Sequence, residues 1–128
     1  MRRLLLMDDE QAVLDLLSRM LTRLGYEVIA CAEGRQAIAA YTQAKSESKP
    51  FDAVIMDLVI CNGMGGEEAI LEIKKIDPKA RVIATSGHLK HPVMLDHKAF
   101  NFDAAVEKPY KLDKLKQVIE SVISTPAA

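Results

Sequence analysis

Aromatic residues are scarce in this chain, which has no tryptophan, three tyrosines and three phenylalanines among its 128 residues. The core must therefore be aliphatic, and 49% of the residues are hydrophobic, which is enough to build one. A chain of this length and composition can bury a proper core within one domain. We expect a single domain that covers residues 1–128.

The sequence also lacks an excess of either charge and any long hydrophobic run. Its formal net charge is −1, with acidic and basic residues interleaved, so no nucleic-acid or membrane-surface patch is predicted. The apolar stretches are of strand length and too short to span a bilayer. The apolar start, 1–7, looks like a signal peptide only briefly, because Asp8, Asp9 and Glu10 end it. We expect a cytoplasmic protein.

Cysteine and histidine are too few and too scattered to predict a transition-metal site. Cys31 and Cys61 form no CxxC pair, and we interpret them as ordinary thiols of a cytosolic protein. Only His88 and His91 have a plausible ligand spacing, and no acid or thiol is fixed beside them. We interpret these two histidines and His97 as solvent-exposed side chains.

Strand-like apolar runs alternate with segments of helical periodicity along the chain. This alternation is typical of a parallel sheet with helices on both faces, and right-handed crossovers make it an open doubly wound sheet. The predicted strands are about 3–7, 27–31, 51–57, 81–85 and 104–106, and the predicted helices are about 10–24, 34–44, 67–76, 93–100 and 112–125.

Particular residues define the first and fourth of these helices. Gly25 is a natural stop for the first helix, and Pro92 suits the first position of the fourth. The polar segment 45–50 is expected to be a loop before the third strand. The apolar residues that recur at helical spacing in the first helix are Val13, Leu16, Leu17, Met20, Leu21 and Leu24.

Charged side chains stand at the carboxyl ends of three predicted strands. Asp8 and Asp9 end the first strand, Asp57 ends the third, and Lys108 follows the fifth. In a doubly wound sheet this edge binds ligands. Three carboxylates can supply oxygen ligands to Mg²⁺, and one of them can attack a phosphoryl group to form an aspartyl phosphate. The ammonium and the hydroxyl of Ser86 would then take further phosphoryl oxygens.

Each of these residues has a plain structural interpretation when it is taken alone. A single aspartate at a strand end is more often a helix cap, and a serine before glycine commonly belongs to a turn. A lone lysine is usually a surface residue. Their joint placement at separate strand ends favours a phosphoryl site over coincidence.

These residues lie in four motifs, and together the motifs resemble the receiver domains of two-component signalling over nearly the whole chain. The motifs are Leu6–Glu10, Val54–Leu58, Ile83–Gly87 and Glu107–Tyr110. The segment 63–69 is most similar to receivers at the C-terminus of hybrid sensor histidine kinases. The resemblance implies a flavodoxin-like fold, with five parallel strands in the order 2-1-3-4-5 and five helices.

The same resemblance implies a role for each site residue. Asp57 would be the phosphoacceptor, and Asp8, Asp9 and Asp57 would bind Mg²⁺ together with the backbone carbonyl of Val59. Ser86 and Lys108 would switch the conformation once the phosphoryl group is in place, and a cis bond would join Lys108 to Pro109.

The implied partner is a histidine kinase or a histidine phosphotransfer domain, with no direct nucleic-acid or membrane partner. The chain would not be an enzyme in the usual sense, because phosphotransfer and dephosphorylation act only on itself. We expect no output domain beside the receiver.

Three positions depart from the pattern of the family. Ala105 stands where many receivers carry a tyrosine or phenylalanine that rotates inward on activation, so the usual aromatic relay is missing. Phe102 and Tyr110 are nearby but do not match that position. Cys61 stands where relatives often have proline, and Asn101 replaces a common glycine.

Two further functions compete with a phosphorylated receiver. A haloacid-dehalogenase-like phosphatase also uses a strand-end aspartate with Mg²⁺, but it needs a second acid two residues later, where this chain has Val59. An interaction module that keeps the fold without being phosphorylated is the other, and Ala105 is a mild point in its favour. Flavin binding is a weaker analogy, because the loops lack a phosphate cradle rich in serine and threonine.

Overall fold

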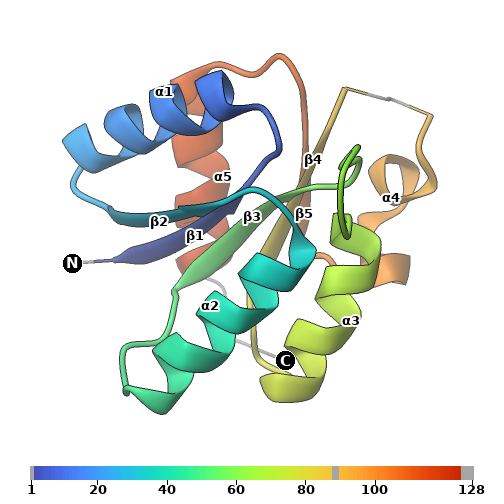
Figure 1. The fold of residues 1–128 in the computed structure, drawn as a ribbon. Coiled ribbons are helices and arrows are strands. Elements are labelled where there is room, and N and C mark those ends of the chain that lie inside the picture. The colour runs from blue at the N-terminus through green and yellow to red at the C-terminus, as the bar shows by residue number, and fades with distance from the viewer. Residues whose placement is uncertain (1, 88–89, 125–128) are drawn as a thin grey trace.

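A five-stranded parallel sheet forms the centre of the molecule in the computed structural model, which describes residues 2–87 and 90–124. The strand order is β2-β1-β3-β4-β5, as the family resemblance implies (Figure 1). All four neighbouring pairs are parallel. The strands are β1 Arg3–Met7, β2 Glu27–Cys31, β3 Ala53–Asp57, β4 Val82–Ser86 and β5 Ala104–Glu107.

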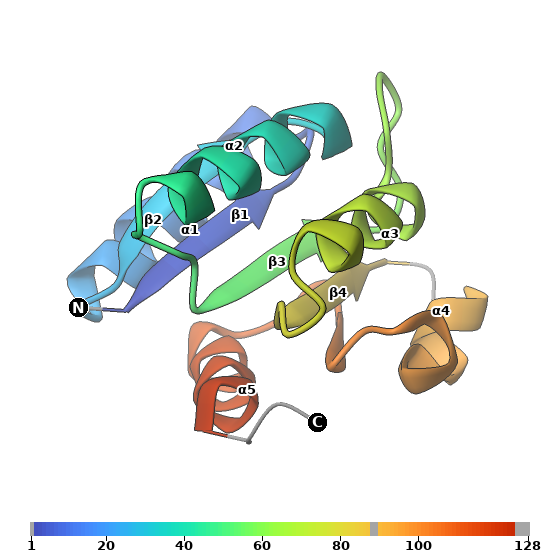
Figure 2. The same ribbon diagram turned by 90° about the horizontal axis from the view of Figure 1, so that it is seen from below.

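Helices connect the strands and cover both faces of the sheet. Helices α1 and α5 lie on one face, while α2 and α3 lie on the other, together with the short α4 (Figures 1 and 2). The helices are α1 Gln11–Arg23, α2 Gly34–Ser46, α3 Gly66–Ile76, α4 Pro92–Leu95 and α5 Leu112–Ser124, and a 3-10 helix, η1, spans His97–Phe100. Among the described residues no helix is long and apolar enough to cross a membrane.

The position of β3 at the centre of the sheet explains why its sequence is a continuous apolar run. Successive side chains of a strand point to opposite faces, and both faces of this sheet are covered. Ala53 and Ile55 pack with α1 and α5, whereas Val54 and Met56 pack with α2 and α3. The strand therefore cannot tolerate polar residues until it reaches Asp57 at its carboxyl end.

The buried face of α1 differs from the prediction. Leu14, Leu17 and Leu21 are buried, whereas Leu16 is 57% exposed and Leu24 is 37% exposed. Leu16 lies two residues, or about 200°, around the helix from Leu14, so the two cannot share one face. The apolar residues of this helix are more numerous than its contact face needs.

The fourth helix is much shorter than predicted. Pro92 occupies its first turn, as expected, but α4 ends at Leu95 and a 3-10 turn follows. Val93 is the one fully buried residue of these two short elements, so little packing holds a longer regular helix. The turn ends at Asn101 with φ of 68°, a left-handed conformation that asparagine tolerates better than most residues. This explains how asparagine can replace the usual glycine.

Smaller differences occur at the ends of other elements. Helix α2 extends to Ser46, which shortens the predicted 45–50 loop, and β4 includes Ser86. Asp77 ends α3 as predicted, and its carboxylate also accepts a hydrogen bond of 2.8 Å from the Tyr41 hydroxyl, which ties α3 to α2. The predicted end of the last helix before Pro126 lies outside the described residues.

Candidate functional site

Three carboxylates converge at the carboxyl edge of the sheet. Asp57 is the last residue of β3, and Asp8 and Asp9 directly follow β1, its neighbour in the sheet. Asp8 and Asp57 are buried, while Asp9 is half-buried. One carboxylate oxygen of each lies within 4.8 Å of the other two. The structure thus brings together the acidic residues that the sequence places at separate strand ends.

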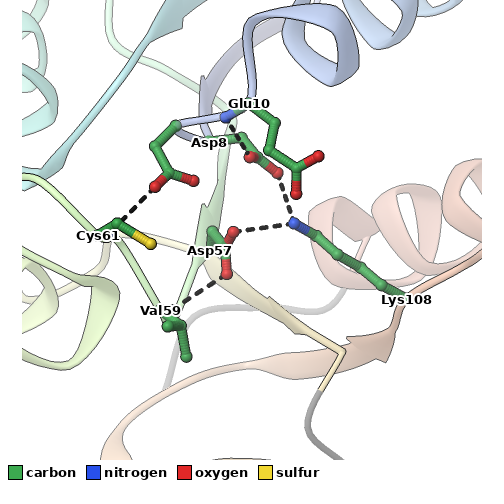
Figure 3. Close-up of polar contacts among 7 residues, drawn as sticks. Asp8, Glu10, Asp57, Val59, Cys61 and Lys108 are labelled. Carbon is green, nitrogen blue, oxygen red and sulfur yellow. Dashed lines mark hydrogen bonds and ion pairs between the residues drawn. The ribbon is translucent and has the colours of Figure 1, made fainter.

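Backbone N–H groups of the loops hold each carboxylate in place. The Glu10 N–H donates to Asp8 Oδ1 at 2.9 Å, and the Val59 N–H donates to Asp57 Oδ1 at 3.1 Å (Figure 3). The Cys61 N–H donates to Asp9 Oδ2 at 2.9 Å and so ties the loop after β3 to the loop after β1. The acidic cluster is therefore fixed by two loops.

Lys108 supplies the positive charge of the site. Its Nζ lies 2.6 Å from Asp8 Oδ2 and 2.9 Å from Asp57 Oδ2, so one ammonium pairs with two carboxylates (Figure 3). Burial alone would lower the pKa of this lysine, but the hydrogen bonds and charges of Asp8 and Asp57 outweigh it and raise the pKa above its usual value. Lys108 therefore stays charged throughout the physiological range.

The backbone of β5 places this lysine. The Lys108 N–H donates to the Ser86 carbonyl at 2.9 Å, which continues the pairing of β4 with β5 beyond the strand end. The peptide bond between Lys108 and Pro109 is cis, as the family resemblance implies. Ser86 itself is buried at the end of β4, and its neighbour Thr85 is in register with Asp57. The five polar residues predicted for the site thus lie at one edge of the sheet.

The donor set suits a hard divalent cation. Its side-chain donors are carboxylate oxygens, which Mg²⁺ prefers over nitrogen or sulfur. Carboxylates this close together repel one another, and a cation relieves the repulsion in addition to Lys108. Asp8, Asp9 and Asp57 would hold the ion.

The histidines do not contribute to this cluster as far as they are described. His91 is only partly exposed, contrary to the prediction: its Nδ1 accepts the Val93 N–H at 3.2 Å, and its Nε2 lies 3.1 Å from Glu67 Oε1. His97 is also partly buried. Packing of the two short helices against each other and against β5 accompanies this partial burial. His88 lies outside the described residues.

The cysteines are free, as predicted. Burial, together with the nearby Glu33 charge, raises the pKa of Cys31 to about 12, so its thiol stays protonated and unreactive. Cys61 is exposed in the loop after β3. The sequence indicates Cys61 as an ordinary thiol at a position where relatives often have proline, and it does not predict that the Cys61 backbone N–H donates to Asp9.

A second anchor of this loop was also missed. The Gly34 N–H, at the start of α2, donates to the Met64 carbonyl at 2.7 Å. A Cβ atom at Gly34 would lie 2.7 Å from Met64 Cγ and 2.9 Å from the Met64 carbonyl oxygen. The glycine therefore permits the close approach. No sequence pattern predicts this contact, because Gly34 and Met64 are brought together only by the path of the loop after β3.

Comparison with known proteins identifies the family. Residues 4–120 match the model of the response regulator receiver domain. This chain belongs to the receiver domain family. It is 31% identical to the chemotaxis protein CheY of Thermotoga maritima over 122 residues, which are 94% of this chain and 97% of that protein. It is 26% identical to hybrid signal transduction histidine kinase L of Dictyostelium discoideum over 92% of this chain but only 7% of the kinase.

Solved receiver structures share the fold and in two cases a bound ion. The response regulator TrrA of Thermotoga maritima, in complex with Mg²⁺ and BeF, has a TM-score of 0.78 and 28% identity, covering 95% of this chain and 99% of that one. The receiver domain of the Pseudomonas aeruginosa sensor histidine kinase PA1611, with magnesium in its active site cleft, has a TM-score of 0.84 and 22% identity, covering 97% and 98%. The receiver is a signalling module of two-component systems.

Proposed function

We propose that Asp57 accepts a phosphoryl group from a phosphohistidine of a partner protein. The observation that carries the proposal is the Lys108 ammonium, which joins Asp57 to Asp8 inside a cluster of three carboxylates. A structural aspartate that merely capped a helix would need neither the acidic pair Asp8 and Asp9 nor the partly buried cation Lys108. The similarity to receivers solved with Mg²⁺ supports the same conclusion.

The transfer exchanges one bond of phosphorus for another. A carboxylate oxygen of Asp57 forms an O–P bond while the N–P bond to the partner's imidazole breaks, and the imidazole leaves with the electron pair. Because Asp57 Oδ1 is held by the Val59 N–H, Oδ2 is the oxygen available for attack once Lys108 moves from it to a phosphoryl oxygen. Lys108 thus exchanges one oxygen partner for another and stays paired.

Mg²⁺ is the cation that we propose for this cluster. Asp8, Asp9 and Asp57 would bind it, with the backbone carbonyl of Val59 as a further ligand. When bound, the ion supplies positive charge against the phosphoryl oxygens. The hydrogen bonds from Glu10 and Cys61 orient Asp8 and Asp9 before the ion arrives, so little reorganisation is needed.

The response to phosphorylation would begin at Ser86 and Lys108. A phosphoryl group on Asp57 attracts the Ser86 hydroxyl at the end of β4 and the Lys108 ammonium after β5, and it favours the backbone arrangement that brings both close. Ala105 has no ring to follow that movement. It is only partly buried beside the cluster that includes Val93 and Phe102. We propose that the backbone of β4 and β5 carries the change.

The wider setting of the protein follows from this role. The phosphodonor would be a histidine kinase or a histidine phosphotransfer domain in the cytoplasm, where free thiols such as Cys31 and Cys61 persist. The chain would catalyse only its own phosphorylation and dephosphorylation. We propose that residues 1–128 form a single receiver unit, and that it is most similar to the receivers of hybrid kinases.

The test is a titration with beryllofluoride, which mimics a phosphoryl group, followed by backbone amide NMR. With Mg²⁺ present we expect the amides of 57–59, 86–87 and 107–108 to shift at a protein-to-ligand ratio near one. The Asp57→Asn variant should show no such shift, because it lacks the anionic oxygen. If wild-type amides stay unchanged, the chain is an interaction module that is not phosphorylated.

A further inference from the structure

A groove of about 970 Å³ opens at the edge of the sheet opposite the acidic cluster. Its lining residues come from the amino ends of β4 and β5, the loop after α3 and one face of α5. Figure 2 shows how α3, β4 and α5 are arranged. Arg81 precedes β4, and Thr85, four residues later, is in register with Asp57. Four strand residues span roughly 13 Å, so the groove is separate from the phosphoryl site.

The groove concentrates positive charge in a chain whose net charge is −1. The single carboxylate in its lining, Asp103, is already compensated, because it accepts the Val82 N–H at 2.8 Å and lies 3.8 Å from Lys74 Nζ. Among the described residues, the cations that line it are Lys74, Lys79, Arg81, Lys98 and Lys114. The electrostatic field of this groove therefore favours an anionic ligand.

The apolar part of the lining indicates whether a peptide or a nucleic acid suits the groove better as an anionic ligand. Pro78, which is exposed, and Val118, which is partly exposed, contribute apolar surface between the cations. Phe102, the aromatic residue of the lining, is only 1% exposed and offers no ring face on which a base could stack. Apolar surface surrounded by cations suits carboxylates and aliphatic side chains, so it suits a peptide better than a nucleic acid.

We propose that this groove binds an acidic segment of a partner protein that alternates carboxylates with aliphatic side chains. The carboxylates would pair with Lys79, Lys98 and Lys114, which are exposed, while the aliphatic side chains cover Pro78 and Val118. The site is independent of phosphate on Asp57, so the proposal stands or falls apart from the phosphoacceptor role.

The test uses the whole chain and a fluorescent synthetic peptide of glutamate and leucine residues. Anisotropy measures its affinity, and amide NMR maps where it binds. We expect saturable binding that weakens with salt, with amide shifts confined to 79–81, 101–104 and 114–122. Absence of saturable binding, or shifts centred on 57–59, would overturn the proposal. So would tighter binding of a single-stranded oligonucleotide of equal charge at the same amides.

Matched charge reversals on exposed lysines make the test specific. Lys114 lines the groove and Lys116, two residues later on α5, does not, and both are exposed. The double variant Lys79→Glu/Lys114→Glu should bind the peptide at least about tenfold more weakly, whereas Lys111→Glu/Lys116→Glu, an equal charge change on exposed lysines outside the groove, should change affinity less than about twofold. Equal losses in both would contradict a defined groove. Lys98→Glu replaces the double variant if the circular dichroism of that variant differs from wild type.

Discussion

The Lys108 ammonium lies 2.9 Å from Asp57 Oδ2 and joins the end of β5 to the end of β3 across the intervening strand β4. The two residues are 51 positions apart in the sequence. Their contact exists only because β4 is a single short strand between them and the lysine side chain is long enough to pass its end. A conformational change at Asp57 is therefore transmitted directly to the end of β5, which lies beyond β4 in the sheet.

Removal of the Lys108 charge should destabilise the protein when no divalent cation is present. Lys108→Met leaves Asp8 and Asp57 uncompensated at short range, and we expect the free energy of unfolding to fall by about 2 kcal/mol in urea titrations with a chelator. Added Mg²⁺ should restore more stability to this variant than to wild type. Lys111→Met, on an exposed neighbour, is the control, and an equal loss there would argue against the ion pair.

Alkaline pH should reduce the stability that the protein gains from the hydrogen bond between Tyr26 and Glu120 of α5. The Tyr26 hydroxyl donates to Glu120, and burial, followed by this hydrogen bond, raises the pKa of Tyr26 to about 12. Between its ordinary value of 10.0 and about 12 the unfolded tyrosine ionises while the folded one keeps its proton. Unfolding then releases a proton. The contribution of Tyr26 to the free energy of unfolding is therefore complete below pH 10 and is lost as the pH rises toward about 12.

The Tyr26→Phe variant isolates this effect from other groups that titrate in the same range. Its stability should start lower than that of wild type and fall less steeply above pH 10. Urea unfolding at a series of pH values measures both slopes. Parallel curves for the two proteins would show that Tyr26 does not titrate differently on folding.

The turn after η1 should depend on the residue at position 101. Asn101 has φ of 68°, where a Cβ without a helpful polar side chain is unfavourable. We expect Asn101→Ala to cost about 1 kcal/mol and Asn101→Gly to cost less, or to stabilise slightly. Thermal unfolding of the two variants measures this difference in stability. An alanine variant as stable as the glycine variant would contradict the prediction.

Gly34 should be intolerant of a methyl group. In Gly34→Ala the new Cβ meets Met64 at 2.9 Å or less, including its backbone oxygen, so the loop after β3 must shift. We expect a loss of about 1–3 kcal/mol and weaker Mg²⁺ binding, because the same loop carries the Cys61 N–H that orients Asp9. Gly87→Ala, where nothing lies within 4 Å of the added Cβ, is the stability control and should stay close to wild type.

The sequence predicts most of this fold because local pattern and tertiary structure agree in the strands. The strand 27–31 has the predicted bounds, and the alternation of strands and helices leads to the observed sheet. Of the apolar residues predicted at helical spacing in α1, Leu17 and Leu21 are buried but Leu16 is exposed, because leucines at 14, 16, 17 and 21 fit more than one face. Only packing against the sheet selects Leu14 over Leu16.

Prediction of the site from the sequence has the same limit, because some of its contacts depend on tertiary structure alone. The convergence of Asp8, Asp9 and Asp57 follows from strand ends alone, since parallel strands end at one edge. The anchors of the loop after β3, at Cys61 and Gly34, depend on backbone contacts that carry no side-chain signal. The length of α4 likewise depends on how little of 92–100 is buried.

The most direct measurement of the central claim is the intact mass of the protein after incubation with Mg²⁺ and a small phosphodonor. We predict an adduct of one phosphoryl group in wild type, lost when Mg²⁺ is chelated beforehand and absent in Asp57→Asn. An adduct that persists in Asp57→Asn, or its absence from wild type under conditions that label a known receiver, would contradict the assignment of Asp57 as the phosphoacceptor.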